Sequence, residues 1–345
     1  MYKYKFSPIK TLCPICHSKK AHILYSVDSD QAAHLIFNKK KNNLQFNELK
    51  SQIESLWQGY LCDFIQCDEC RFCYANPFIS GNAAFYTLAY GMEAKYQSWK
   101  WDFQITYQTI QKMVGPGIQK STYLLEIGAG NGTFARKVAT SLLAKENILC
   151  IEYSEYGMNA INAEGIKCLS QDVREMDLDQ FGGKFDIVCM FHVLEHMDQL
   201  DVLFEHLTKV TTEKASMFVA VPNFKQREFY DLHGIIEDVP PTHIGRWNWR
   251  CFEIIGKRHG WMVTGYEIEP QTFISKAYRF VSFRFTRSKL SSWLDQIHMR
   301  ALRRIVKLIC FGFYTLISLP VIISLNSSDL GVSQWVHLKK GLDGK

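Results

Sequence analysis

An acidic residue followed by three alternating glycines is the pattern with the most chemical information in this sequence. The motif consists of Glu126, Gly128, Gly130 and Gly132, at the end of an apolar run that begins at Tyr123. An apolar strand, a tight glycine turn and a helix N-terminus form the place where an α/β sheet receives a nucleoside-bearing ligand. A dinucleotide-binding loop would need its third glycine at position 133, where this sequence has Thr133. The motif therefore predicts a ligand that contains a nucleoside but no pyrophosphate.

Two pairs of cysteines have the spacing of a metal site. Two residues separate Cys13 from Cys16, and two residues separate Cys67 from Cys70. This spacing lets a tight turn direct both sulfur atoms at one tetrahedral ion, and two such turns supply four ligands. We therefore predict a structural zinc ion, because four thiolates leave no open position for a substrate. Four ordinary buried cysteines are the alternative.

The two pairs belong to a predicted small N-terminal domain that is similar to a zinc ribbon. The 50 residues between Cys16 and Cys67 are too many for a simple ribbon and indicate a helical insertion, for which Phe46–Trp57 has helical spacing. Cys62 and Cys73 lie near enough in the sequence to be alternative ligands, although the position of Cys73 is typical of a buried strand.

Three histidines follow predicted strands, and histidine is the side chain best suited to accept a proton near neutral pH. His192 and His196 come directly after the apolar run 184–190, at the end of a strand where open α/β sheets bind their ligands. His243 follows two consecutive prolines, which fix the direction of the backbone without regular secondary structure.

Five apolar segments must position these residues, and they alternate with gaps of helical length. The segments are 123–127, 147–152, 166–169, 184–190 and 216–221. Such alternation predicts a Rossmann-like α/β fold with a mostly parallel sheet covered on both faces. Glu152 ends the second segment, 20 residues after Gly132, where an acid accepts hydrogen bonds from the hydroxyl groups of a ribose.

These motifs resemble those of the class I S-adenosylmethionine-dependent methyltransferases, and the resemblance covers about residues 10–340. It implies a seven-stranded sheet with S-adenosylmethionine as the cofactor. The cofactor-binding residues it implies are Glu126, Gly128, Gly130, Asn131, Gly132, Glu152, Asp172, Val173 and His192. In this family the acid after the third strand meets the adenine amino group, and the next apolar residue packs on the ring. A nicotinamide site, or a glycine turn without a ligand, is the alternative.

The resemblance also implies the reaction. The methyl group of a sulfonium is already activated, so the enzyme must place an acceptor in line behind it and exclude water. Residues 239–247 resemble the acceptor-side loop of bacterial methyltransferases that modify sugars and glycans, and we assign His243 as the candidate base or acceptor anchor. Arg246 and Trp247 are the predicted wall of the acceptor pocket. The alternative is that His243 caps the following helix.

His196 is the second candidate catalytic residue. The segment from Val193 to His196 resembles a motif that follows the fourth strand in these methyltransferases. In some quinone-type relatives its Glu-His pair helps to hold a divalent metal, and a structural role at the start of a helix is the alternative.

The C-terminal quarter contains a hydrophobic insert before the last predicted strand. Leu308–Leu325 is a run of 18 residues without a charge, and Arg300, Arg303, Arg304 and Lys307 precede it. Its length and cationic flank indicate membrane contact through residues 285–328. Segments 261–269 and 333–338 read as the last two strands of one sheet, so the insert must dip into the membrane and return, bending at Pro320, or lie at the interface. A dimer interface or a cover over the acceptor site is the alternative.

Composition sets the remaining expectations. The 345 residues include 40 basic and 34 acidic side chains without an arginine-rich arm, so we expect no nucleic-acid partner. The first residues lack the apolar core of a signal peptide, and eleven cysteines in such a chain favour reduced thiols. We expect a cytoplasmic enzyme that is peripheral or monotopic on the inner face of the membrane, and a homodimer if the insert is an interface.

The predicted domain order is a zinc-binding domain (1–80), an aromatic helical cover and linker (81–117), a methyltransferase core (118–270), a helical insert (271–332) and a final strand with a tail (333–345). The expected function is methylation of a saccharide or lipid-linked glycan in polysaccharide biosynthesis. One alternative is a cytosolic methyltransferase of a sugar nucleotide or another small hydroxylated metabolite. A non-catalytic scaffold that contains zinc is a further alternative.

Overall fold

The computed structural model describes residues 12–39, 42–90, 98–236, 239–286, 288–294, 300–325 and 329–341. Parts of the predicted N-terminal domain, aromatic cover, insert and C-terminal tail lie outside these residues. The chain forms two compact units. The first comprises Met1–Pro222, Asp238–Glu267 and Gln334–Lys345, and the second comprises Asn223–Glu237 and Ile268–Ser333. The finer division into five domains stays a prediction.

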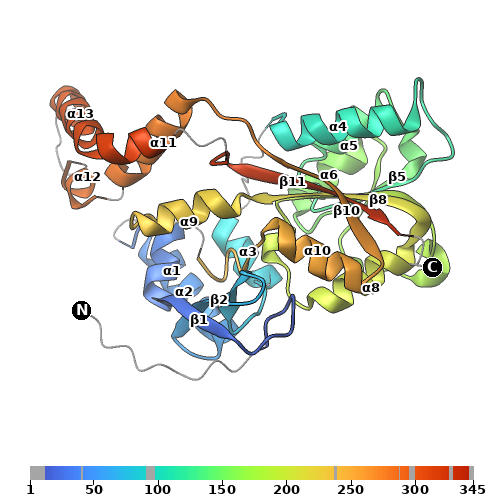
Figure 1. The fold of residues 1–345 in the computed structure, drawn as a ribbon, viewed down its shortest axis with the longest axis horizontal. Helices are drawn as coiled ribbons and strands as arrows, with labels where there is room; N and C mark the ends of the chain where they lie inside the picture. The colour runs from blue at the N-terminus through green and yellow to red at the C-terminus, as the bar shows by residue number, and fades with distance from the viewer. Residues whose placement is uncertain are drawn as a thin grey trace. The chain divides into compact units, whose positions relative to one another are not determined.

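A seven-stranded sheet is the main element of the first unit (Figure 1). Its strands are β4 (Leu124–Ile127), β5 (Ile148–Ile151), β6 (Lys167–Leu169), β7 (Phe185–Phe191), β8 (Thr211–Pro222), β10 (Trp261–Ile268) and β11 (Ser333–Lys340). Their order across the sheet is β10-β11-β8-β7-β4-β5-β6. The pairs β4–β5, β4–β7, β5–β6 and β7–β8 are parallel. The predicted fold class, a mostly parallel Rossmann-like sheet, is confirmed.

The last two strands run in opposite directions. The backbone N–H of Glu269 donates to the carbonyl of Ser333, and that of Gly341 donates to the carbonyl of Gly260. These two pairs join opposite ends of β10 and β11, so the strands are antiparallel. The chain leaves the sheet after β10 and returns beside it as β11, with the predicted insert in between.

Helices cover both faces of the sheet (Figure 1). One face carries α4 (Trp101–Val114), α5 (Thr133–Ala139) and α6 (Glu155–Ala163), and the other carries α7 (Leu178–Phe181), α8 (Leu200–Val210) and α10 (Trp249–Arg258). Short helical turns lie at η1 (Lys145–Asn147), η2 (Val173–Glu175) and η3 (Leu194–His196). Every residue of β4 and β5 is buried, as expected for parallel strands that pack against helices on both sides.

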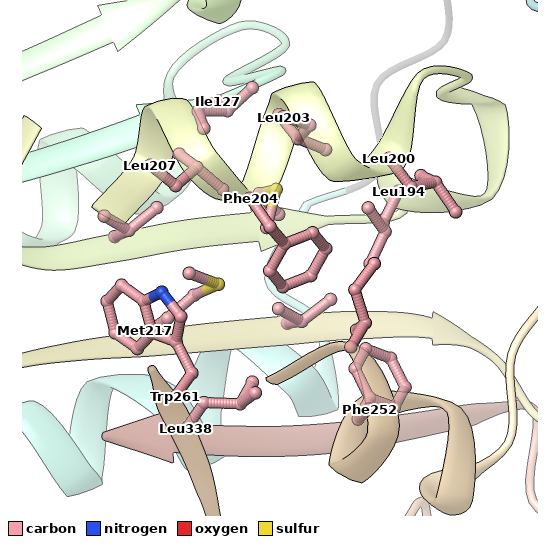
Figure 2. Close-up of a cluster of buried hydrophobic side chains, with 14 of the residues drawn as sticks. Ile127, Leu194, Leu200, Leu203, Phe204, Leu207, Met217, Phe252, Trp261 and Leu338 are labelled. Carbon is pink, nitrogen blue, oxygen red and sulfur yellow. The ribbon is translucent and has the colours of Figure 1, made fainter. Parts of the chain in front are cut away.

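Large apolar side chains fill the space between α8 and the strands (Figure 2). The cluster includes Leu200, Leu203, Phe204 and Leu207 of α8, Met217 of β8, Phe252 of α10, Trp261 of β10 and Leu338 of β11. The four residues of α8 recur at the spacing that places side chains on one face of a helix. Burial of each such side chain contributes about 1.5–3 kcal/mol, so this cluster holds α8 and α10 on the sheet.

A second, smaller sheet in the same unit contains the N-terminal strands. Its order is β1 (Ala21–Asp28), β2 (Leu61–Cys67), β3 (Cys73–Asn76) and β9 (Gly245–Arg246). Helices α1 (Ser29–Ile36) and α2 (Asn43–Trp57) lie between β1 and β2 in the sequence, and α3 (Ala83–Tyr90) follows β3. The predicted helix 46–57 is present within α2. β9 lies much later in the sequence than the other three strands. Its antiparallel pairing with β3 was not predicted from the sequence.

The second unit is helical in the residues that the structure describes. It contains α9 (Phe224–Leu232), α11 (Phe273–Thr286), α12 (Lys289–Leu294) and α13 (Arg300–Ser324). Its buried apolar residues include Tyr230 of α9, Phe280 of α11 and Ile322 of α13. α13 continues through Pro320 to Ser324, and the predicted bend at Pro320 stays a prediction. α11 and α13 pack against each other.

Candidate functional site

The predicted cofactor loop lies between β4 and α5, and its three glycines have left-handed backbones. The φ angles are +68° at Gly128, +57° at Gly130 and +76° at Gly132, values that other residues rarely adopt. A Cβ atom on Gly128 would lie 2.3 Å from Val193 Cγ2, and one on Gly132 would lie 2.6 Å from Ile161 Cγ1. The alternating glycines are therefore required both by backbone conformation and by close packing.

Glu152, the predicted ribose-binding acid, lies just after β5 and holds this loop in place. Its Oε2 accepts a hydrogen bond from the backbone N–H of Gly130 at 2.8 Å, and its Oε1 accepts one from Ser154 at 2.8 Å. The carbonyl oxygen of Asn131 accepts a hydrogen bond from Arg136 Nη1 at 2.6 Å. The structure thus brings together the predicted loop and the predicted acid, whose role toward a ribose stays a prediction.

Glu126, the acid of the first motif, is almost fully buried at the end of β4. Burial raises the pKa of its carboxyl group to about 8, and the negative charge of Glu152 acts in the same direction. A hydrogen bond from the backbone N–H of Ala135 opposes this shift and connects Glu126 to the first turn of α5. Glu126 therefore fixes the strand and the helix that enclose the glycine loop.

Asp172 and Val173, the predicted adenine contacts, follow β6. Arg174 binds the Asp172 carboxylate through Nη2 at 2.5 Å and Nε at 2.8 Å, and its Nη1 lies 3.0 Å from Asp198 Oδ1. Burial acts to raise the pKa of Asp172, but the hydrogen bonds and charge of Arg174 outweigh it and hold the pKa below its ordinary value. Val173 is buried. The roles of both residues toward adenine stay predictions.

His192 lies between two buried carboxylates. Its Nε2 is 3.0 Å from Asp102 Oδ2, and its Nδ1 is 3.4 Å from Glu195 Oε1. Burial by itself lowers the pKa of a histidine, but the two carboxylates outweigh this and raise the pKa of His192 to about 9. The residue is also held at a φ of +58°, a strained conformation of the kind that persists at functional sites. His192 is therefore a fixed imidazolium at neutral pH.

Glu195, His196 and His243 form a cluster after β7, which we call the histidine cluster. Each residue has one potential ligand atom within 4.8 Å of those of the other two, and the two histidine rings are 4.7 Å apart between centroids. His196 Nδ1 lies 2.5 Å from the carbonyl oxygen of Thr242. A carbonyl only accepts hydrogen bonds, so Nδ1 carries the hydrogen and the lone pair is on Nε2.

The two candidate catalytic histidines are thus neighbours in space. Burial, and then the charge of His243, lower the pKa of His196 to about 4, so this imidazole is neutral at physiological pH. Glu195 is buried, which acts to raise its pKa, but contact with His192 outweighs burial and keeps the carboxyl group ionised. A neutral imidazole beside a carboxylate can accept a proton or bind a metal ion.

The backbone of Ile244 connects the histidine cluster to the N-terminal sheet. Its N–H donates to the carbonyl oxygen of Glu195 at 2.9 Å, and its carbonyl accepts from the N–H of Ala75 at 2.9 Å. β9 follows directly and pairs with β3. The position of His243 therefore depends on strands from the first quarter of the chain.

Arg246 and Trp247, the predicted pocket wall, are both buried. The guanidinium carbon of Arg246 lies 4.8 Å from the ring centroid of Phe64, and its Nη2 donates to Tyr25 Oη at 3.0 Å. The ring of Trp247 packs edge-on against Phe72, 5.2 Å between centroids. Trp247 also stacks on Phe252 of α10, 4.9 Å between ring centroids. The roles of Arg246 and Trp247 toward an acceptor stay predictions.

The four predicted metal ligands, Cys13, Cys16, Cys67 and Cys70, lie together. The sulfur atoms of Cys13 and Cys70 are 3.5 Å apart, and those of Cys16 and Cys67 are 3.4 Å apart. All four sulfurs lie within 4.8 Å of one another, and Cys62 and Cys73 are not among them. Zinc bound to four thiolates has bonds of about 2.3 Å, which places neighbouring sulfurs at nearly these separations. The donor set fits a structural zinc ion.

Hydrogen bonds join this cysteine cluster to the helices beside the histidine cluster. The carbonyl oxygen of Cys70 accepts a hydrogen bond from Asn248 Nδ2 at 3.0 Å, one residue after Trp247. On the other side, His17 Nε2 lies 3.0 Å from Asp201 Oδ2 of α8, and Arg258 of α10 donates to the carbonyl of Ile15. The cysteine cluster therefore supports both the segment that contains His243 and the helices that cover the sheet.

Two groups in this region were not identified from the sequence. Asp102 is buried in α4 and forms an ion pair with His192, which is distant in the sequence. The residues around Asp102, such as Trp101, form no pattern that indicates this contact. Arg174, which forms ion pairs with both Asp172 and Asp198, could have been suspected because it follows an acid in a predicted loop.

Comparison with known proteins identifies the family. Residues 98–272 match the family model described as a methyltransferase domain. Because the match spans half of the sequence, the chain belongs to this methyltransferase family. It is an S-adenosylmethionine-dependent methyltransferase. A search of curated proteins found no match.

Solved structures with a similar arrangement include a SAM-dependent methyltransferase from Archaeoglobus fulgidus, with 16% identity, 69% of this chain and 94% of that chain covered, and a TM-score of 0.43. The YcgJ protein from Bacillus subtilis has 10% identity and a TM-score of 0.43, and the match covers 70% of this chain and 99% of that chain. A phosphoethanolamine N-methyltransferase from Haemonchus contortus has 14% identity and a TM-score of 0.41, and the match covers 74% of this chain and 56% of that chain.

Proposed function

We propose that this methyltransferase transfers a methyl group to a hydroxyl group of a saccharide, and that its acceptor is a lipid-linked glycan at the cytoplasmic face of the membrane. The observation that carries the membrane assignment is the exposed apolar face of α13. The histidine cluster supports the assignment of a hydroxyl acceptor. The fold and the family leave the acceptor open, because one sheet serves many acceptors.

The exposed face of α13 is apolar along its length. Leu308, Ile309, Phe313, Leu316 and Ile323 are each more than half exposed, with Leu308 at 73% and Ile323 at 71%. Within α13, Arg303–Ser324 is long and apolar enough to cross a membrane, yet only 11% of its most apolar window is buried. A core helix of this composition would be mostly buried. Exposed apolar surface of this extent marks an interaction site.

The opposite face of α13 packs against α11. Phe285 of α11 lies 6.0 Å from Phe311 and 5.5 Å from Tyr314 between ring centroids, and Arg284 Nη1 donates to Ser318 Oγ at 3.1 Å. The polar contact is therefore inside the helical pair and the aliphatic side chains are outside. This arrangement suits a nonpolar solvent around the pair.

Basic residues at the start of α13 favour an anionic membrane surface as the partner. The first turns contain Arg300, Arg303, Arg304 and Lys307. Cations beside an apolar helix face are typical of helices that lie at the interface of a membrane, where each contributes about 1 kcal/mol near anionic lipids. A lipid-linked acceptor would be concentrated at that surface.

The test is methyl transfer from labelled S-adenosylmethionine to a polyprenyl-linked sugar extract in anionic vesicles and, in parallel, to soluble sugar nucleotides. We expect the wild-type chain to prefer the vesicle-bound acceptor. The double substitution of Leu308→Glu and Phe313→Glu should abolish vesicle binding and that preference while leaving affinity for the methyl donor unchanged. Leu44→Glu changes a side chain that is 80% exposed on α2 and is the matched control.

Two outcomes would contradict the proposal. Equal activity of the wild-type chain on both acceptor classes would favour a soluble sugar nucleotide or another small hydroxylated metabolite. A change from dimer to monomer in the double variant, without any vesicle binding by the wild type, would show that α13 covers a second copy of the chain.

A further inference from the structure

The carboxylate of Asp172 is occupied by hydrogen-bond donors from this chain. Its Oδ1 accepts hydrogen bonds from the backbone N–H and the Nε of Arg174, both at 2.8 Å, and its Oδ2 accepts one from Arg174 Nη2 at 2.5 Å. The hydroxyl group of Tyr153 is a fourth donor to this carboxylate. A carboxylate has about four lone-pair positions, so the amino group of a bound ligand would have to displace one of these donors.

Arg174 also binds a second carboxylate, that of Asp198. Its Nη1 donates to the carbonyl oxygen of Asp198 and to Asp198 Oδ1, both at 3.0 Å. The other carboxylate oxygen of Asp198, Oδ2, accepts a hydrogen bond from the backbone N–H of Ser80 at 3.0 Å. Asp172, Arg174, Asp198 and Ser80 are therefore joined by a continuous series of hydrogen bonds, which we call the Arg174 network.

The charged side chains of the Arg174 network are largely protected from water. Their exposed fractions are 17% for Arg174, 20% for Asp172 and 13% for Asp198. Exposed ion pairs contribute little to stability, whereas loss of one partner of a buried pair leaves a charge without compensation. The planar guanidinium group also fixes the direction of the carboxylates that it binds, which the ammonium group of a lysine does not. The Arg174 network therefore holds its loops in one arrangement.

The Arg174 network lies at the edge of the sheet where the donor must bind. β4, β5, β6 and β7 are parallel, so the loops that follow them meet at the same edge, where open α/β sheets bind their ligands. Asp172 follows β6, and Asp198 follows β7 and the turn η3. Ser80 lies between β3 of the N-terminal sheet and α3. The network therefore connects two loops of the donor edge to the segment that leaves the N-terminal sheet.

We propose that Arg174 is a positioning residue for the donor site, and that Asp172 acts through Arg174 and makes no hydrogen bond to the adenine amino group. Arg174 fixes the loop after β6 against the loop after β7 and, through Asp198, against the N-terminal segment at Ser80. This role is the same for any acceptor, because it concerns the donor alone. Failure of methyl transfer to a saccharide would therefore leave it intact.

The first test compares two ligands by calorimetric titration of the full-length chain. One is S-adenosylhomocysteine, and the other is its analogue in which purine replaces adenine, so that the amino group is missing. The ratio of the two affinities measures the preference for the amino group. We expect Asp172→Ala to weaken both ligands by about tenfold, as for other groups that support a site indirectly, with an unchanged ratio. A lower ratio in Asp172→Ala would show that Asp172 binds the amino group and would overturn the proposal.

A double-mutant cycle tests whether Asp172 acts through Arg174. Arg174→Met should weaken donor binding by a similar factor, and the double variant with Asp172→Ala should bind no more weakly than either single variant, because both changes break the same network. Effects that multiply in the double variant would show independent roles and contradict the proposal. Arg174→Lys retains the charge and serves if Arg174→Met does not fold. Its donor affinity should fall by a smaller factor with an unchanged ratio.

Amide hydrogen exchange tests the connection to the N-terminal segment. In Arg174→Met the backbone N–H of Ser80 should exchange faster, because Asp198 has lost the partner that fixes it. Lys209→Met removes a cation from an exposed ion pair with Glu205 at 2.7 Å and is the matched control. It should keep the exchange rate and the donor affinity of the wild type. Unchanged exchange at Ser80 in Arg174→Met, or donor affinity equal to that of the wild type, would overturn the proposal.

Discussion

The glycine loop and the histidine cluster are assembled in different ways. The glycine loop is built from consecutive parts of the sequence, and its hydrogen bond from Gly130 to Glu152 spans 22 residues. The histidine cluster joins Glu195 to His243, and the Ile244 backbone connects it to Ala75 in the N-terminal sheet. The comparison teaches that the predicted donor site depends on local structure, whereas the candidate acceptor site depends on the packing of three distant segments.

The largest expected effect separates the two regions directly. His243→Ala should reduce methyl transfer by about 10²–10⁴-fold, the usual range for loss of a group that assists proton removal. Affinity for S-adenosylmethionine should stay within about twofold of the wild type, because the glycine loop and Glu152 are intact. Turnover measured with labelled donor and calorimetric affinity test both statements. Unchanged turnover with normal donor binding would remove His243 from the chemistry.

The next prediction concerns pH and the glycine loop. The pKa of Glu126 is raised from 4.5 to about 8. Between these two pH values the folded chain keeps a proton on Glu126 that the unfolded chain has lost. The free energy of unfolding therefore falls as the pH rises from about 4.5 to about 8. Glu126→Gln should remove this dependence, by an amount on the order of 2–4 kcal/mol across the window.

Urea denaturation of the wild type and of Glu126→Gln at several pH values measures the effect. The exposed Glu164→Gln is the control and should follow the wild type. Parallel pH profiles of the wild type and Glu126→Gln would show that the Glu126 carboxyl group is ionised in the folded chain.

A substitution in the glycine loop should give the reverse of the His243→Ala result, because it should weaken binding of the methyl donor. Gly128→Ala introduces a Cβ at 2.3 Å from Val193 and a left-handed backbone at φ +68°. The clash with Val193 should displace the loop assigned to the donor, in addition to about 1–2 kcal/mol of backbone strain, so donor affinity should fall by about 10- to 100-fold. Gly165→Ala has the same backbone strain at φ +74° without a close neighbour and is the matched control. Equal donor affinity in the two variants would contradict the assigned loop.

The smallest expected effect tests the link between the cysteine cluster and His243. Removal of the predicted zinc ion, or Cys13→Ser with Cys16→Ser, should loosen β3 and the Ile244 backbone that holds the histidine cluster. Methyl transfer should fall by about tenfold, as for other groups that support a site indirectly, with donor affinity preserved. Cys62→Ala, outside the cluster, should retain activity. A loss of donor affinity in the cysteine variants would show that the two regions are not independent.

The difference between the regions also explains what the sequence could predict. Five of the seven strands were predicted because each is a short apolar run between turn residues, and β4 and β5 are buried along their whole length. β10 and β11 were predicted from strand-like runs together with the seven strands that the family resemblance implies. The glycine loop was predicted because its conformation and its partner, Glu152, are fixed within one strand–helix–strand unit. The cysteine cluster was predicted from the ligand spacing alone.

The histidine cluster was predicted only in part. His196 and His243 were identified as separate candidates. The pairing of β9 with β3 brings His243 close to His196, and this long-range pairing has no local pattern in the sequence that could predict it. Asp102 was missed because a single acid in an aromatic helix has no spacing that indicates a distant histidine. The buried positions of Arg246 and Trp247 likewise follow from contacts with Phe64 and Phe72, which are more than 170 residues away in the sequence.

Titration of S-adenosylmethionine into the purified, folded chain is the most direct measurement of the donor site. Saturable one-to-one heat is expected for the wild type, an equal affinity for His243→Ala, and a large loss for Glu152→Lys, which reverses the charge that holds Gly130. If the folded wild type gives no saturable heat, or if Glu152→Lys binds as tightly as the wild type, the donor site lies elsewhere.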